Sequence, residues 1–344
     1  MKAAVFYAPN DLRLEERAIP HPRNGEIVVK VDVSGLCPSD VRIYKVGSSS
    51  VKAPVTLGHE FVGHVHELGP EVRDIEENDK VNVPADAYCG KCRMCQGGHE
   101  NTCEDMLTFG YNLNGAHADY VLVPPRFVER GGIFPLSDEV DTEEATMIEP
   151  LACSLNTIES LGAGPGKTIV VIGDGPMGLL HVALARLYAA ERIILIGLVD
   201  KKLQLGKELG ATDLIDAKGD ATKAVLEVTG GVGSDIVVIT AVMPQTIAEA
   251  LRMVSRHGYV SIFGGTPKGA KAEFEPNLIH YNEAFLTGNF GYTYATYSRA
   301  AKIVASHKIP LKRLISHRFK LEQIHDAIKT WDDKENSMKI MLTR

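Results

Sequence analysis

The strongest constraint on the fold of this 344-residue chain is a glycine-rich turn near its middle. An apolar run, Thr168–Ile172, precedes the turn, and a stretch rich in alanine and leucine follows it as far as Leu187. The turn has the spacing G-x-G-x-x-G, in which glycines let the backbone approach a pyrophosphate and the following helix N-terminus stabilises its charge. The sequence therefore predicts a dinucleotide site, at the turn residues Gly173, Gly175, Pro176, Met177 and Gly178.

Beyond the turn, apolar strands alternate with helical stretches. This alternation is typical of βαβ units and of a parallel sheet. We expect an α/β domain over residues 154–289. Its further strands are expected at 192–199, 235–240 and 258–263, and its helices at 201–209 and 244–256.

The first 130 residues look different and read as mainly β. Valine-rich or partly alternating segments predict strands near 26–33, 61–67 and 79–84, and no clear helix alternates with them. The tail leaves the βαβ rhythm at about residue 290 and is expected to pack back on the first part. A first domain of residues 1–153 and 290–344 would then be interrupted by the α/β domain; the tail helices are expected at 295–306 and 321–331.

Composition limits the possible functions. The net charge of -7 argues against a nucleic-acid surface, and no apolar run reaches the length of a membrane span. The start of the chain carries no signal-peptide pattern, so a cytoplasmic location is expected. Its six cysteines are too clustered for a disulfide framework and read as metal ligands in a reducing compartment.

Four of the cysteines, Cys89, Cys92, Cys95 and Cys103, lie within fifteen residues. Four thiolates can surround one metal without help from the rest of the fold, which suits a closed structural zinc site. An iron–sulfur cluster uses similar spacing and is the competing interpretation. Zinc is preferred because nothing else in the sequence indicates electron transfer.

A second group of possible ligands is spread along the chain. Gly58-His59-Glu60 places an imidazole beside a carboxylate, Cys37 lies twenty-two residues upstream of His59, and Glu149 lies far downstream. Cys37, His59 and a carboxylate from Glu60 or Glu149 would form a tetrahedral zinc site that keeps one position open, as catalytic sites do. The sequence does not decide between the two glutamates.

These motifs, in this order, resemble the zinc-dependent medium-chain alcohol dehydrogenases, within them the polyol (sorbitol/iditol) and threonine dehydrogenase branch. The similarity covers nearly the whole chain, and Glu149-Pro150-Leu151 resembles the polyol branch. It implies a GroES-like β-rich catalytic domain with an inserted Rossmann NAD(P)-binding domain. It also implies one catalytic and one structural zinc ion and a homo-oligomer, tetramer or dimer.

The resemblance implies reversible hydride transfer between a secondary alcohol and a nicotinamide. Zinc would act as a Lewis acid on the alcohol, and Ser39 would take the alcohol proton. His59 and Glu60 belong to the same centre, and Asp40 is expected to support it from behind. A polyol is the favoured substrate. The alternatives are an L-threonine 3-dehydrogenase, a non-catalytic nicotinamide-binding sensor or structural protein, and a zinc-free quinone reductase.

Two departures from the family pattern concern single residues of the first domain. Arg42 stands where the family often has a proton-relay histidine, and arginine stays protonated at ordinary pH, so it cannot shuttle a proton there. It could instead hold a cofactor phosphate or be a surface residue. His117 stands where an aromatic or apolar residue is usual; it could make the pocket more polar, but we expect it to be solvated.

A third departure concerns the cofactor. NAD-specific sites place an acid at the end of the second strand, where it binds the ribose 2′-hydroxyl. Counting only from the glycine turn would make Asp200 this acid. The family register instead puts Gly197 there and leaves Asp200 in the loop beyond, so no carboxylate is expected to repel a 2′-phosphate. Lys201 and Lys202 follow and could pair with the phosphate. We therefore expect NADP to be favoured over NAD.

Overall fold

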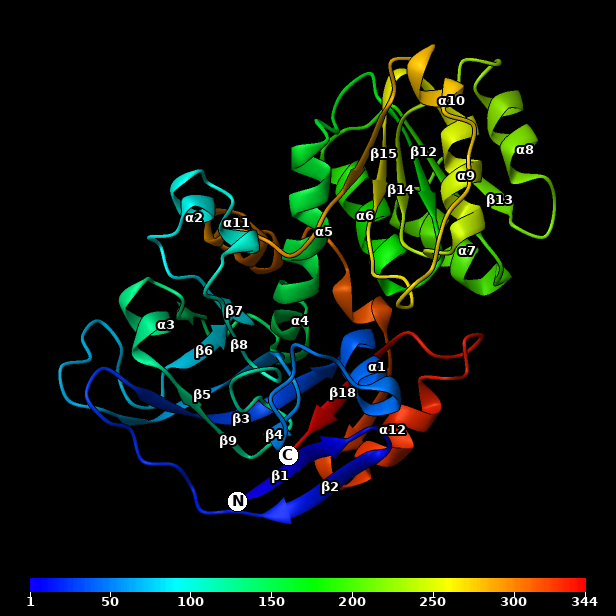
Figure 1. Cartoon of the computed structure of the whole chain (residues 1–344). Coiled ribbons are helices and arrows are strands. Elements are labelled where there is room, and N and C mark those ends of the chain that lie inside the picture. The colour runs from blue at the N-terminus through cyan, green and yellow to red at the C-terminus, as the bar shows by residue number, and fades with distance from the viewer. The chain divides into compact units, whose positions relative to one another are not determined.

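The computed structural model describes residues 1–344 and divides into two compact units. Unit 1 comprises Met1–Pro150 and Thr293–Arg344, and unit 2 comprises Leu151–Tyr292. The chain thus leaves unit 1, builds unit 2 and returns (Figure 1). The domain boundaries expected from the sequence lie within three residues of these positions.

A six-stranded parallel sheet forms the centre of unit 2. Its spatial order, β13-β12-β11-β14-β15-β16, is that of a dinucleotide-binding fold, in which the chain starts in the middle and builds outward in both directions. The central strand, β11, pairs with β12 on one side and β14 on the other. The strands are β11 (Thr168–Ile172), β12 (Arg192–Gly197), β13 (Asp213–Asp216), β14 (Ser234–Ile239), β15 (Val254–Ile262) and β16 (Phe285–Gly288).

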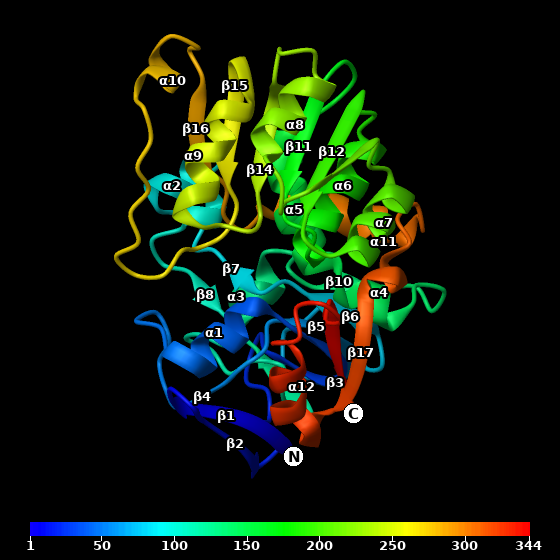
Figure 2. The same cartoon turned by 90° about the vertical axis from the view of Figure 1, so that its right-hand side faces the viewer.

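Helices cover both faces of this sheet, which explains why its strands are continuous apolar runs (Figure 2). Ile194 and Ile196 pack with the helices α8 and α9, whereas Leu195 points the other way and meets Gly206 of α7 and, beside it, Leu179 of α6. The helices of unit 2 are α6 (Pro176–Leu187), α7 (Asp200–Leu209), α8 (Ala221–Val228), α9 (Pro244–Met253) and α10 (Asn277–His280), and α5 (Ile148–Ser160) leads into it.

The structure adds to or corrects three predictions for unit 2. β12 ends at Gly197 rather than at residue 199, because α7 begins at Asp200. α9 ends at Met253 because β15 follows it without a loop. The short strands β13 and β16 and the helix α8 were not predicted, since each is too short to show a clear hydrophobic period.

Unit 1 is built on a seven-stranded sheet whose main path runs β10-β6-β5-β3-β18-β17, with β9 also paired to β3. A three-stranded sheet, β2-β1-β4, and the pair β7-β8 complete it. The strands are β1 (Lys2–Ala8), β2 (Asp11–Glu16), β3 (Ile27–Leu36), β4 (Val55–Thr56), β5 (Glu60–Leu68), β6 (Lys80–Val83), β7 (Asp86–Ala87), β8 (Leu107–Thr108), β9 (Tyr120–Val123), β10 (Phe134–Pro135), β17 (Ile315–Lys320) and β18 (Lys339–Thr343).

The tail contributes more than the two predicted helices. β18 pairs antiparallel with β3, and β17 pairs parallel with β18, so the last thirty residues complete the sheet of unit 1. These strands were missed because the alternation in 315–320 is short and polar. The helices of unit 1 are α1 (Pro38–Val46), α2 (Arg93–Gln96), α3 (Pro125–Glu129), α4 (Thr142–Thr146), α11 (Tyr294–Ala305) and α12 (Ile324–Thr330), with short 3₁₀ turns at Glu100–Thr102, Leu311–Leu314 and Leu321–Gln323.

No helix of either unit is long and apolar enough to span a membrane.

Candidate metal centres and dinucleotide site

Cys37, His59 and Glu60 converge in unit 1. Cys37 follows β3 directly and stands at the N-cap of α1, while Glu60 is the first residue of the neighbouring strand β5. The pairing of β3 with β5 sets Gly35 opposite Glu60 and so brings the two segments together. The potential ligand atoms of these residues all lie within 4.8 Å of one another, close enough to share one metal ion.

Gly58 lets two adjacent side chains reach the same ion. Its φ of +93° lies in the left-handed region, which favours glycine, and it bends the backbone just before His59. A Cβ atom at Gly58 would also lie 2.5 Å from Nδ1 of His117. The glycine is therefore required both by its conformation and by its packing.

Asp40 holds the two ligand segments together from behind. Its Oδ2 atom accepts a hydrogen bond from the Cys37 amide at 3.1 Å, and its Oδ1 atom accepts one from the Gly58 amide at 3.3 Å. The same carboxylate lies 3.5 Å from Nδ1 of His59. Burial alone would raise the pKa of Asp40, but the facing histidines hold it well below its usual range. A carboxylate behind a ligating histidine fixes its ring and raises its basicity.

His117 belongs to this support, and the expectation that it is solvated is wrong. Its side chain is fully buried, with Nε2 3.4 Å from Oδ2 of Asp40 and Nδ1 3.1 Å from Oγ of Ser34. Arg344, at the other end of the chain, donates from Nη2 to Oγ of Ser34 at 3.3 Å. Because Gly58 has no side chain, the ring of His117 fits beside it in the interior of unit 1.

Glu60 and Glu149 occupy different environments. Glu60 forms a buried ion pair with Lys339, which comes from β18 in the tail. Glu149, near the start of α5, lies outside the group of three ligand atoms, yet burial and the charge of Glu60 raise its pKa to about 7. The structure thus brings Glu60 to Cys37 and His59 and leaves Glu149 as a neighbouring buried carboxyl. Lys339 could not be foreseen, because its partner is 279 residues away in sequence.

Ser39 and Tyr111 border the same centre. The hydroxyl oxygen of Ser39 is buried and has no hydrogen-bond partner of normal geometry, so it is available to a ligand. The ring of Tyr111 meets that of His59 edge to face, with centroids 6.3 Å apart. Burial raises the pKa of Tyr111, and the charge of His59 and the hydroxyl of Ser39 oppose that rise. No motif in the sequence indicates Tyr111. Arg42 is exposed on α1.

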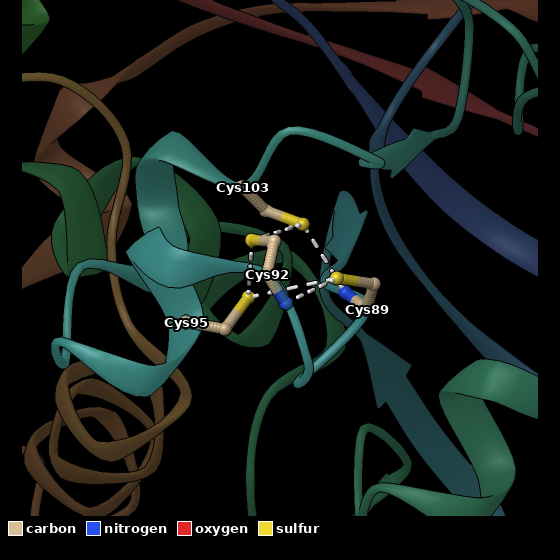
Figure 3. Close-up of side chains that lie close together, drawn as sticks. All are labelled: Cys89, Cys92, Cys95 and Cys103. Atoms are coloured by element: carbon tan, nitrogen blue, oxygen red, sulfur yellow. Dashed lines mark hydrogen bonds between the residues drawn. The ribbon is translucent and has the colours of Figure 1, made fainter.

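The four clustered cysteines form the second candidate metal centre (Figure 3). Their sulfur atoms approach one another at 3.4 Å for Cys92 and Cys95, 3.9 Å for Cys92 and Cys103, and 4.0 Å for Cys89 and Cys95. The edge of a ZnS₄ tetrahedron is about 3.8 Å, because each Zn–S bond is about 2.3 Å long. The arrangement therefore fits one tetrahedral ion.

Backbone amides prepare this cluster for a cation. The amide of Cys89 donates to the Cys103 sulfur at 3.2 Å, and the amide of Cys92 donates to the Cys89 sulfur at 3.3 Å. Hydrogen bonds from the amides of Cys95 and Glu104 lower the pKa of Cys92 to about 6. Such bonds favour the thiolate form, which is the form that binds metal.

The glycine turn of unit 2 has the shape that a pyrophosphate requires. Gly175 caps α6 without a side-chain cap, and a Cβ there would meet no atom within 4 Å, so the helix N-terminus is open. A Cβ on Gly178 would lie 1.8 Å from the carbonyl oxygen of Gly173, so the third glycine permits close packing of helix and strand. The residues present fit a dinucleotide whose phosphates lie at the start of α6.

The end of β12 is only partly as expected. Gly197 is the last residue of the strand, as the family register implies, but Asp200 is the first residue of α7 rather than part of the loop. However, the side chain of Asp174, from the glycine turn, packs against Gly197, so this position is not free of negative charge. Lys201 is exposed, whereas Lys202 is buried.

Models of two protein families match the chain. The alcohol dehydrogenase GroES-like domain covers residues 23–131 and the zinc-binding dehydrogenase domain covers residues 176–306. Together with the two metal-ligand clusters and the dinucleotide fold, these matches define a class of enzyme. The chain belongs to the zinc-dependent medium-chain alcohol dehydrogenase family. It is an NAD(P)-dependent enzyme that acts on CH–OH groups.

Individual relatives cover most or all of the chain. It is 31% identical to the sorbitol dehydrogenase of Bacillus subtilis over 99% of this chain and 97% of that protein. It is 32% identical to the L-threonine 3-dehydrogenase of Pyrococcus horikoshii over 89% of this chain and 88% of that protein. A crystal structure from Sinorhizobium meliloti 1021, described as a zinc-binding dehydrogenase bound to NADP, superposes with a TM-score of 0.92 at 32% identity and covers 100% of this chain and 99% of that one.

Proposed function

We propose that the protein oxidises a secondary hydroxyl of a polyol or sugar alcohol, reversibly, with NAD(P). The observation that carries this proposal is the presence of two buried carboxyls, Glu60 and Glu149, at the Cys37–His59 centre. A carboxyl-rich centre offers hydrogen-bond acceptors to a ligand that carries several hydroxyls. Similarity to a sorbitol dehydrogenase supports the same substrate class.

Cys37, His59 and Glu60 would hold the catalytic zinc, and Glu149 is the alternative carboxylate ligand. When bound there, zinc supplies Lewis acidity that polarises the substrate hydroxyl. Asp40 orients His59, and Lys339 balances the charge of Glu60. The zinc contents of Glu60→Ala and Glu149→Ala test the choice, because only loss of the true ligand should empty the site while the four-cysteine site keeps its ion.

Ser39 is proposed to relay the substrate proton: its oxygen accepts that proton while its own hydroxyl proton passes to a hydroxyl of the cofactor ribose. Its buried hydroxyl makes no regular hydrogen bond and lies on the first turn of α1, one residue after Pro38 and two after Cys37. Tyr111 closes the same side of the centre. Ser39→Ala should lower kcat by about 10²–10⁴-fold with zinc retained, because acid–base groups contribute about that much. Near-native turnover would show that another group carries the proton.

The nicotinamide cofactor accepts the hydride, and unit 2 would bind it at the glycine turn. NADP is supported by the exposed Lys201 at the start of α7 and by the NADP-bound relative. Asp174 acts in the opposite direction, since a carboxylate repels a 2′-phosphate. We therefore propose that both cofactors are accepted.

A second candidate substrate is L-threonine, because a threonine 3-dehydrogenase is as similar to this chain as the sorbitol enzyme. The test is a panel of polyols, sugars, simple alcohols and threonine, each assayed with both cofactors. A polyol should give the highest kcat/KM. A preference for threonine would assign the enzyme to the other branch of the family.

We further propose that the chain forms a cytoplasmic homo-oligomer. A reducing compartment would keep the metal-binding thiols available. β16 is an edge strand of the sheet in unit 2, and Phe285 on it and Tyr281 nearby expose 48% and 73% of their surface. Unpaired edges with exposed aromatic side chains favour association with another chain. Light scattering should give a mass above one chain, which Phe285→Lys should reduce; a monomeric wild type would refute the proposal.

A further inference from the structure

The carboxylate of Asp174 occupies the space of a side chain that Gly197 lacks. A Cβ atom built on Gly197 would lie 2.5 Å from Cβ, 2.6 Å from Oδ2 and 2.7 Å from Cγ of Asp174. Gly197 is the last residue of β12, the position from which dinucleotide folds usually present the acid that binds the ribose 2′-hydroxyl. A negative group is therefore present at this position, but it comes from another segment of the chain.

Two hydrogen bonds hold the carboxylate in place. Oδ2 of Asp174 accepts from the amides of Leu198 and Val199, both at 2.8 Å. These residues link β12 to α7, so the carboxylate also lies near the positive end of that helix. Oδ1 takes no part in these two bonds, and the residue is only partly buried, so a ligand can reach it.

The position of Asp174 in sequence connects the two ends of the expected dinucleotide site. It lies between Gly173 and Gly175, inside the turn that fits the pyrophosphate, and its side chain extends to the end of β12. One residue thus spans the short distance between the phosphate turn and the ribose position. Asp200, by contrast, is exposed on the first turn of α7, and the three atoms nearest to a Cβ on Gly197 all belong to Asp174.

From this arrangement we infer that Asp174, rather than Asp200 or residue 197, selects between NAD and NADP. The inference rests on the proposed function, in which a nicotinamide dinucleotide binds at the glycine turn. Oδ1 accepts a hydrogen bond from the ribose 2′-hydroxyl of NAD, and the same negative charge repels the 2′-phosphate of NADP. Lys201 attracts that phosphate, so the cofactor ratio reflects the balance between these two residues.

The first test neutralises the carboxylate without changing its shape. Dissociation constants for NADH and NADPH are measured by calorimetry on zinc-loaded protein, independently of any substrate. Asp174→Asn should raise the preference for NADPH about tenfold or more, since losing a charge contact of this kind is worth about one factor of ten. The matched control, Asp200→Asn, should leave the ratio unchanged.

Two results would overturn the inference. An equal weakening of both cofactors in Asp174→Asn would mean that Asp174 only supports the backbone at 198–199. A shift of the ratio in Asp200→Asn, with none in Asp174→Asn, would assign the selection to Asp200. If neither cofactor binds the wild type, the proposed function itself fails, and that outcome is distinct from both.

A second test moves the acid to the strand. Gly197→Asp alone should weaken both cofactors, because the new side chain would collide with Asp174. The double variant Asp174→Gly with Gly197→Asp removes the collision and should restore binding, with NADH preferred. Thermal unfolding of each variant shows whether it folds. A folded double variant that prefers NADPH, or a single Gly197→Asp variant with wild-type binding, would contradict the inference.

Discussion

Asp40 shows how single residues of the catalytic centre act together. Its carboxylate accepts hydrogen bonds from backbone amides of both ligand segments, and it faces His59 on one side and His117 on the other. Cys37 and His59 could be proposed as ligands from the order of short sequence motifs, which left the third ligand open between Glu60 and Glu149. The buried partners could not, since His117 and Lys339 reach the centre from other strands or loops and only the folded chain brings them there.

We predict that His117→Leu lowers the zinc affinity of the catalytic site. Asp40 would lose one of the two rings that face its carboxylate, and His59 would be held less firmly. Loss of such an outer contact typically lowers metal affinity about 10–100-fold. Zinc competition with a chelator should show this loss at one site per chain, while the four-cysteine site is unchanged. The conservative His117→Gln should recover part of the affinity; equal affinity in wild type and His117→Leu would exclude the positioning role.

The four-cysteine centre is formed within one short segment of the chain, residues 89–103. Its cysteines and the amides that bond them lie within one short stretch, which is why the spacing alone predicted a closed site. Long apolar runs such as β11 and β12 were likewise predictable, because both faces of the sheet are covered. The short strands of the tail were not, because the pairing of β18 with β3 and of β17 with β18 is set by tertiary structure.

We predict that Cys95→Ser removes one zinc ion per chain and lowers stability more than turnover. Metal binding to a closed cysteine site contributes directly to the folding of its loop. The zinc content measured by elemental analysis should fall from two ions per chain to one. The thermal unfolding midpoint should also fall, while kcat/KM of the folded protein stays near that of the wild type. Detection of iron in place of zinc would instead support an iron–sulfur cluster.

Helix α6 contains a histidine that makes stability depend on pH. His181 is buried, Nδ1 donates to the carbonyl of Met177 at 2.7 Å, and Nε2 has no partner. Burial lowers its pKa from 6.5 to about 4. The unfolded chain therefore binds more protons between these pH values, and stability conferred by the neutral ring is present above about pH 6.5 and lost as the pH falls toward about 4.

The size of this loss is about 3 kcal/mol, since each pKa unit corresponds to about 1.4 kcal/mol. His181→Leu removes the titrating group and fills the same apolar space. Urea unfolding of wild type and variant at a series of pH values should give stability curves that diverge below about pH 6.5, the wild type losing more. Stability curves that run parallel for wild type and His181→Leu would mean that the protonated ring of His181 finds a hydrogen-bond partner in the folded protein.

For the molecule as a whole, the sequence predicted two domains, a dinucleotide turn and two metal centres. The matches to a GroES-like domain and to a zinc-binding dehydrogenase domain support this organisation. What it could not predict is the chemistry created by packing: the ion pair of Glu60 with Lys339, and the carboxylate of Asp174 at the end of β12. Each unit contributes one part of the reaction. Unit 1 carries the proposed metal ligands and the proposed proton acceptor, and unit 2 carries the glycine turn.

In the proposed reaction, the Cys37–His59–Glu60 centre oxidises a polyol with a nicotinamide cofactor. The most direct measurement is the rate of nicotinamide reduction with a sugar alcohol, for zinc-loaded wild type and for Cys37→Ser with its metal content determined in parallel. We predict polyol-dependent turnover in the wild type, loss of about 10³-fold or more in Cys37→Ser from the missing Lewis acid, and retention of the four-cysteine zinc ion. Turnover that survives the loss of the catalytic zinc, or a zinc-loaded wild type with no activity on any polyol, would contradict the proposed reaction.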